Sequence, residues 1–208
     1  MNKYIAELIG TFFLVLTIGC TVIAGGSGVI PPLAIGAVLM VMIFANGHLS
    51  GGHLNPAVTL GVFVRGRCPA GEVAPYMIFQ VIGAVLAAMA VKFLKGGAEV
   101  QALVPAAGQA FLAEFLFTFA LVYVVVNVAT AKGTANNSFY GLAIGMTVMC
   151  GAFAVGDISG GAFNPAVAVG GSILGLFSWS SLWIYLVANL LGGACAGLVF
   201  KFLNPADK

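Results

Sequence analysis

The chain has 208 residues, of which 61% are hydrophobic and only 7% are charged, and its mean hydropathy is +1.11. A soluble domain of this length carries far more charge, so the composition indicates an integral membrane protein. It also argues against a disordered chain, a nucleic-acid-binding surface and a solvated enzyme domain. The net charge of +2 is too small and too scattered to indicate an anionic partner.

Six stretches of the chain are long and apolar enough to cross a membrane. A helix needs about 17 to 25 residues to cross a hydrocarbon core that is about 30 Å thick. Stretches of this kind lie near residues 4–24, 32–48, 74–94, 109–131, 139–155 and 181–203. The sequence therefore predicts an all-α membrane protein with six spanning helices and no extramembrane domain.

The basic residues favour one orientation of these spans. If the amino end lies inside the cell, only Lys92 and Lys95 face the outside. The inside then receives Lys3, Arg65, Arg67, Lys132, Lys201 and Lys208. Cytoplasmic loops are the ones enriched in basic residues, so we expect both termini to be cytoplasmic. The short tails favour a prokaryotic plasma membrane.

The cysteines show no pattern typical of a metal or disulfide site. Cys20, Cys68, Cys150 and Cys195 have neither a paired spacing nor a metal-ligand spacing, and three of them lie in apolar runs. We expect small core residues rather than a disulfide framework or a metal site. The sequence thus predicts no metal and no cofactor.

The chain repeats itself. At an offset of 109, residues 50–61 match residues 159–170 with eight identities in twelve positions. At an offset of 107, Ala6 and Glu7 match Ala113 and Glu114. The chain is therefore expected to form a single domain over 1–208 that consists of two halves, about 1–100 and 108–208, with three spans each. An odd number of crossings inverts the second half, and inverted repeats place a functional site at their shared midplane.

Each half contains an apolar stretch, near 54–64 and 163–175, that is too short to cross the membrane. The two stretches open with Asn55, Pro56 and Ala57, and with Asn164, Pro165 and Ala166. Asn is a strong N-cap and Pro suits the first helical turn. The preceding Ser-Gly-Gly suits irregular backbone, which survives at membrane depth only inside protein or beside a water-filled cavity. We therefore predict two re-entrant half-helices from opposite faces, with Asn55 and Asn164 facing each other near the centre.

Two such helix ends would form a narrow path for neutral polar solutes. The asparagines can donate hydrogen bonds to a passing molecule, while the positive helix ends, each about half an elementary charge, repel cations and protons. A single Asn-Pro-Ala is ordinarily a capped helix or a loop, and we interpret residues 204–206 after the last span in that way. Two copies in repeat register indicate a pore.

These residues give the chain a resemblance to a known family. The segment from Ser50 to Thr59, the second motif at residues 164–166, and the stretch from Ala6 to Val15 resemble the aquaporin or major intrinsic protein family. The resemblance covers essentially the whole chain. It implies six tilted helices plus two half-helices, a pore in each protomer, and a homotetramer in membrane lipid.

The resemblance also implies a constriction outside the paired motifs. Water-selective members have an aromatic residue on the second span, a histidine on the fifth, a small loop residue, and an arginine directly after the second motif. Counting without gaps places these positions at Ile35, Ala152, Gly161 and Val167, with Met149 or Phe153 as neighbours that could take the place of Ala152. We therefore expect a constriction that is wider and more apolar than that of the water-selective members, and that passes water together with urea, ammonia, hydrogen peroxide or glycerol.

Several further residues are expected to shape the fold. Glu7 and Glu114 lie inside spans, where a charge is costly unless it is partnered, so we expect each to accept hydrogen bonds from a loop rather than relay protons. His48 and His53 lie five residues apart, which does not suit a helical zinc pair, and a loop-anchoring role is expected instead. Glycines such as Gly83 and Gly192 indicate close helix contacts.

Other functions remain as alternatives. A dedicated glycerol facilitator of this family usually has Asp where Ala168 stands. The resemblance also implies a marker pair on the sixth span, which is Pro-Leu in glycerol facilitators and aromatic-Trp in water channels. The pair Tyr185-Leu186 in this chain is a mixture of the two. An ion-coupled transporter with inverted repeats would have only Asp157 and the two glutamates for its coupling ion. The sequence has none of the common hydrolase or metalloprotease motifs, so we expect no enzyme. The expected partners are water, small neutral solutes and lipid, and not nucleic acid.

Overall fold

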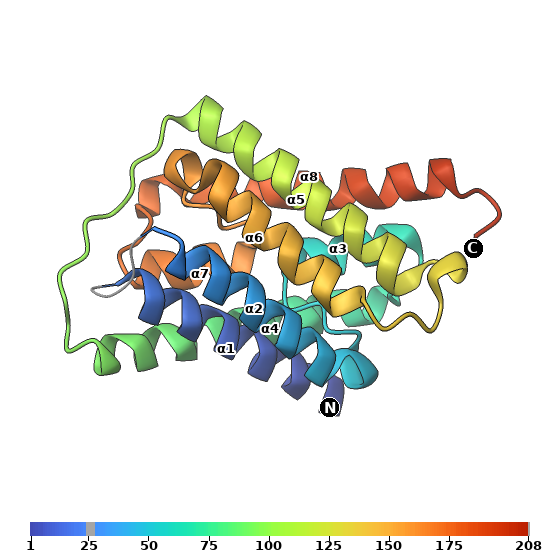
Figure 1. Cartoon of the computed structure of the whole chain (residues 1–208), viewed down its shortest axis with the longest axis horizontal. Helices are drawn as coiled ribbons and strands as arrows, with labels where there is room; N and C mark the ends of the chain where they lie inside the picture. The colour runs from blue at the N-terminus through green and yellow to red at the C-terminus, as the bar shows by residue number, and fades with distance from the viewer. Residues whose placement is uncertain (24–27, 208) are drawn as a thin grey trace.

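The computed structural model describes residues 1–23 and 28–207, and within them the chain is almost entirely helical (Figure 1). The helices are α1 (Asn2–Val22), α2 (Ile30–Ser50), α3 (Pro56–Arg65), α4 (Ala70–Leu94), α5 (Ala107–Thr130), α6 (Tyr140–Ser159), α7 (Pro165–Ile173) and α8 (Leu182–Leu203), with two short 3-10 helices, η1 (Lys132–Thr134) and η2 (Trp179–Ser181). Residue 24 of the first predicted span, and Lys208, lie outside the described residues.

The prediction of six spans is confirmed. Six helices in the described part of the chain are long and apolar enough to cross a membrane: α1, α2, α4, α5, α6 and α8. Their outward surface carries large exposed apolar side chains, such as Ile78, Leu112 and Leu198. Large apolar side chains exposed on helices of membrane-spanning length suit contact with lipid.

The two short helices begin where their asparagine caps predict. The Asn55 side chain accepts the Ala57 N–H at 2.8 Å, and the Asn164 side chain accepts the Ala166 N–H at 2.9 Å. Both helices start at the proline, two residues after the start of the apolar stretches predicted near 54–64 and 163–175, because the asparagine before each proline is extended. With 10 and 9 residues, α3 and α7 are each roughly 15 Å long or less, about half the hydrocarbon core.

The second four α-helices follow the order of the first four. Each set consists of two long helices, one short helix and a third long helix. Figure 1 shows both termini at one end of the bundle, with α3 toward that end and α7 toward the opposite one. The two short helices thus approach the middle of the molecule from opposite ends.

Two glycines let long helices approach closely in equivalent places. A Cβ atom added at Gly83 of α4 would lie 2.4 Å from the Leu8 carbonyl oxygen of α1. A Cβ atom added at Gly192 of α8 would lie 2.7 Å from the Phe115 carbonyl oxygen of α5. Backbone atoms cannot yield as a flexible side chain can, so the interpretation of these glycines as close helix contacts is confirmed.

We predict that Gly192→Ala separates α8 from α5 and lowers the melting temperature in detergent. The expected loss is about 1–3 kcal/mol, the range for overpacking a well-packed core. Gly71→Ala is the matched control, because no atom lies within 4 Å of a Cβ added there and alanine is the better helix former. Equal melting temperatures for Gly192→Ala and the unmodified chain would contradict the prediction.

Candidate functional site: a path between two half-helices

The capped ends of α3 and α7 meet at the centre of the protein. The Asn55 Nδ2 donates to the Phe163 carbonyl oxygen at 2.8 Å, and the Asn164 Nδ2 donates to the Leu54 carbonyl oxygen at 2.9 Å. Each side chain therefore binds the residue that precedes the other asparagine. A side-chain amide has two N–H groups, so each asparagine keeps one for another acceptor.

Both asparagines line one central cavity of about 410 Å³. They are otherwise buried, with 3% and 4% of their surfaces exposed. The same cavity is lined by the four residues that counting placed at the constriction: Ile35, Ala152, Gly161 and Val167. The structure thus brings together residues from α2, α6, α7 and the loop before α7, although they lie far apart in the sequence.

The two neighbours of Ala152 lie elsewhere. Phe153 is 48% exposed on the outer surface of α6. Met149 packs toward α2, where its Cβ lies 2.7 Å from the position of a Cβ added at Gly36. Of the three candidates on α6, Ala152 is the one that lines the cavity.

Aromatic and aliphatic residues that the sequence did not single out also line this cavity. Phe163 directly precedes the second motif, and Leu103 and Phe177 come from two connections. The Leu103 N–H donates to the Leu176 carbonyl oxygen at 2.9 Å, which fixes the connection after α4 beside the one after α7. The Phe163 ring lies beside Gly161, since a Cβ added at that glycine would be 3.4 Å from the ring. Phe163 could have been suspected from its place next to Asn164, whereas no local signal marks the two connections.

A buried carboxylate holds the first loop in shape. Glu7 Oε1 accepts hydrogen bonds from the Ser50 hydroxyl at 2.6 Å and the His53 N–H at 2.9 Å. Its Oε2 accepts the Leu54 N–H at 2.6 Å and the Gln80 side-chain amide at 2.7 Å. Glu7 thereby satisfies two backbone donors of the loop, those of His53 and Leu54.

Glu114 occupies the same position beside the second loop. Its Oε1 accepts the Ser159 hydroxyl at 2.7 Å and the Ala162 N–H at 2.9 Å, and its Oε2 accepts the Phe163 N–H at 2.8 Å. The loops are alike in backbone strain, because Leu54 and Phe163 both have positive φ angles, of 51° and 47°. Such backbone is costly for a residue with a side chain and persists where surrounding contacts fix it.

Two tyrosines complete the loop supports. The Tyr76 hydroxyl donates to the Ser50 carbonyl oxygen at 2.8 Å, and the Tyr185 hydroxyl donates to the Ser159 carbonyl oxygen at 2.7 Å. We did not predict this role for either tyrosine from the sequence. The offset of 109 that relates the two motifs also relates Tyr76 to Tyr185 and could have revealed the pair.

His48 lies in the last turn of α2, and His53 lies in the loop that follows this helix. His53 Nδ1 lies 3.1 Å from the Thr59 hydroxyl, which also accepts the Gln80 amide at 3.0 Å. His53 lines the central cavity and also a second cavity of about 660 Å³, and Val125 does the same. The two cavities therefore adjoin at His53 and Val125. His48 lines only the second cavity of the two, so its loop-anchoring role stays a prediction.

The comparisons with known proteins agree with this geometry. The family described as Major intrinsic protein matches residues 1–200. The chain belongs to the major intrinsic protein family. It is 37% identical over 218 residues to "Aquaporin NIP1-3" of Oryza sativa subsp. japonica, an alignment that covers all of this chain and 75% of that protein. It is 36% identical to "Glycerol uptake facilitator protein-like 6" of Lactiplantibacillus plantarum, over the full length of both.

The fold of this family member also matches a solved structure. The X-ray structure of the aquaglyceroporin from Plasmodium falciparum superposes with a TM-score of 0.85 at 22% identity, covering 99% of this chain and 97% of that one. Members of the major intrinsic protein family are membrane channels rather than enzymes. Family membership and the six apolar helices together make this chain an integral membrane protein.

We predict that Glu114→Ala lowers the melting temperature, because the Ala162 and Phe163 N–H groups lose their acceptor. A buried donor without a partner costs about 1–3 kcal/mol. Glu99→Gln is the control, since it removes an exposed carboxylate from a connection. If both variants melted like the unmodified chain, Glu114 would have no role as a loop support.

Proposed function

We propose that this chain forms a passive channel for water and small neutral solutes, with one pore in each protomer. The observation that carries the proposal is the end-to-end meeting of α3 and α7 inside a lined cavity. The free N–H group of each asparagine offers a hydrogen bond to a passing molecule. The two positive helix ends, each about half an elementary charge, oppose the passage of cations and protons.

The solute range follows from the residues proposed as the constriction. Ile35, Ala152, Gly161 and Val167 provide no side-chain donor and no charge. An opening of this kind admits solutes larger than water if they are neutral, and urea, ammonia, hydrogen peroxide and glycerol are the candidates. Among the described residues that line the central cavity, His53 is the one ordinarily titratable side chain.

A dedicated glycerol facilitator is the second candidate. The Lactiplantibacillus relative is named as a glycerol uptake facilitator, and the Plasmodium protein is described as an aquaglyceroporin, so both point to glycerol. The rice relative is instead named an aquaporin, and its sequence identity to this chain is similar to that of the Lactiplantibacillus relative. The two functions share one pore, and they differ in whether glycerol passes faster than urea.

We further propose the setting of this channel. The chain is one domain built from two inverted halves, about 1–100 and 108–208, and four copies assemble in the membrane of a prokaryotic cell. Both termini face the cytoplasm, because that orientation places most basic residues inside. Glu7, Glu114, His48 and His53 support the two loops. An ion-coupled transporter is less well supported, because the glutamates that would bind its ion already accept several hydrogen bonds each from the loops.

We predict that proteoliposomes show fast osmotic water flow and also fast re-swelling in urea. The reason is the wide, apolar constriction, whose side chains provide neither a charge nor a donor to reject urea. Stopped-flow light scattering measures both rates on the same vesicles, with protein-free liposomes as the control. Water flow without uptake of urea, glycerol or hydrogen peroxide would overturn the proposed solute range.

We predict that Val167→Arg lowers urea and glycerol permeability by at least about tenfold, or about 1.4 kcal/mol in barrier height, while water still passes. The guanidinium would narrow the opening and add a fixed positive charge. Val167→Ile is the matched control, because it adds bulk without charge. An unchanged solute profile in Val167→Arg would place the constriction elsewhere in the pore.

A further inference from the structure

A buried cation lies at the end of the first half-helix. Arg65 is the last residue of α3, and only 1% of its side chain is exposed. Its Nε donates to the Thr130 hydroxyl at 3.1 Å, at the end of α5, and its guanidinium lies 4.3 Å from the centre of the Phe200 ring of α8. A charge this deeply buried is costly unless a counter-charge and hydrogen bonds surround it.

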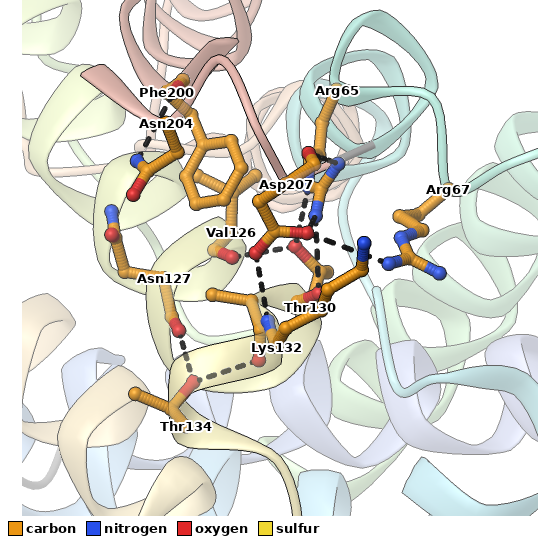
Figure 2. Close-up of polar contacts among 11 residues, drawn as sticks. Arg65, Arg67, Val126, Asn127, Thr130, Lys132, Thr134, Phe200, Asn204 and Asp207 are labelled. Carbon is orange, nitrogen blue, oxygen red and sulfur yellow. Dashed lines mark hydrogen bonds and ion pairs between the residues drawn. The ribbon is translucent and has the colours of Figure 1, made fainter.

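The counter-charge comes from the C-terminal tail (Figure 2). Arg65 Nη2 donates to Asp207 Oδ1 at 2.7 Å, and its Nη1 donates to the Asp207 carbonyl oxygen at 2.9 Å. Asp207 Oδ2 accepts the Lys132 backbone N–H at 2.8 Å, and Arg67 lies 3.6 Å from Oδ1. One carboxylate thus joins the end of α3 to the start of the connection between α5 and α6.

The tail reaches this place by a turn. The Asn204 N–H donates to the Phe200 carbonyl oxygen at 2.9 Å, and the Asp207 N–H donates to the Asn204 carbonyl oxygen at 3.0 Å. Residues 204–206 repeat the Asn-Pro-Ala sequence by coincidence, and here they fold the chain back after α8. We name residues 204–207 the C-terminal strap.

The strap holds parts of the wall of the second cavity. That cavity is lined by Arg67 after α3, by Thr130 at the end of α5, and by Lys132 and Thr134 of the connection. Asp207 contacts Arg67 and Lys132 directly, and Arg65 contacts Thr130. Because the second cavity adjoins the central one at His53 and Val125, its wall borders one entrance to the proposed pore.

We propose that the C-terminal strap is a positioning device that holds the connection 131–139 against the end of α3 and so keeps this entrance open. The proposal rests on the channel function proposed above. Asp207 is its positioning residue, and the connection is the element it restrains. The connection is also anchored to the end of α5, because the Thr134 hydroxyl donates to the Asn127 carbonyl oxygen at 2.5 Å and the Asn137 Nδ2 donates to the Val128 carbonyl oxygen at 2.6 Å. When Asp207 releases the Lys132 N–H, the start of the connection swings on these remaining anchors into the second cavity and obstructs solutes.

The strap is not a switch for mild acid. The Lys132 N–H, and then the guanidinium of Arg65, hold the pKa of the Asp207 carboxyl below its usual value. Among the described residues, the charged groups that face it are Arg65, Arg67 and Lys132. Stabilisation by the ionised carboxylate is complete above the ordinary pKa of Asp and is lost only as the pH falls through the lowered pKa. Asp207 therefore keeps its contacts with Arg65 and the Lys132 N–H across the neutral and mildly acidic pH range.

Two variants test the strap by different routes. Asp207→Asn removes the counter-charge of Arg65. Lys132→Pro removes the backbone donor together with the lysine side chain, and it keeps the Arg65–Asp207 ion pair. Lys132 is the first residue of η1, and Ala131 before it is extended, with φ of −76° and ψ of 141°, so proline fits there. Lys132→Ala is the matched control for the lysine side chain, because it retains the N–H group.

The measurements are osmotic water flow in proteoliposomes, the ratio of urea to water permeability, and amide hydrogen exchange of residues 131–139. We expect both Asp207→Asn and Lys132→Pro to lower water flow at least about twofold, the effect of a connection that is displaced half of the time. Exchange in 131–139 should speed up, while the ratio of urea to water permeability stays constant because the proposed constriction is untouched. Lys132→Ala should retain slow exchange.

Two results would overturn the strap. One is wild-type water flow and wild-type exchange in both variants. The other is a loss of flow with unchanged exchange in 131–139, which would mean that the connection does not cause the loss. A lack of water flow in the unmodified protein would instead refute the channel, and the exchange rates of 131–139 would still decide whether the strap holds the connection.

Discussion

The structure depends on satisfying irregular backbone inside a membrane. The loops before α3 and α7 have backbone N–H groups that neither helix nor water can pair, and Glu7 and Glu114 accept several of them. An unpaired group would cost about 1–3 kcal/mol in each case. Because the two carboxylates fix the loops, the loops can aim Asn55 and Asn164 at one point. The proposed path therefore depends on two buried residues outside the constriction that we assign to it.

The same constraint explains the near-symmetry of the site. Each loop has a carboxylate, a serine, a tyrosine and a strained residue before its asparagine, in equivalent places of the two halves. Val58 and Val167 follow the two motifs and both line the central cavity. An arginine at position 167 would break this similarity and place a positive charge on one side of the central cavity. With valine there, the polar side chains that line the central cavity are those of the two asparagines, Gln101 and His53.

Much of this could be predicted from the sequence, since membrane depth leaves few alternatives. Long apolar runs fix six helices, and Asn-Pro fixes where α3 and α7 begin. The repeat pairs Glu7 with Glu114 at an offset of 107 and relates the two short helices at an offset of 109. Residues brought in by tertiary packing could not be predicted in this way. Leu103 lies in a connection without periodicity, and the Arg65–Asp207 pair joins residues 142 positions apart. Residues 204–206 have the same Asn-Pro-Ala sequence as the other two motifs, and only their position after the last span distinguishes them.

The central claim is that solutes cross passively through the protomer, and one measurement tests it most directly. Proteoliposomes are prepared with urea at equal concentration on both sides, a trace of radiolabelled urea is added outside, and a sodium or proton gradient is imposed. The account predicts that the internal urea concentration stays equal to the external one, whatever the direction of the gradient, while exchange of label is fast relative to protein-free vesicles. Accumulation of urea against its concentration in response to either gradient would contradict a passive pore.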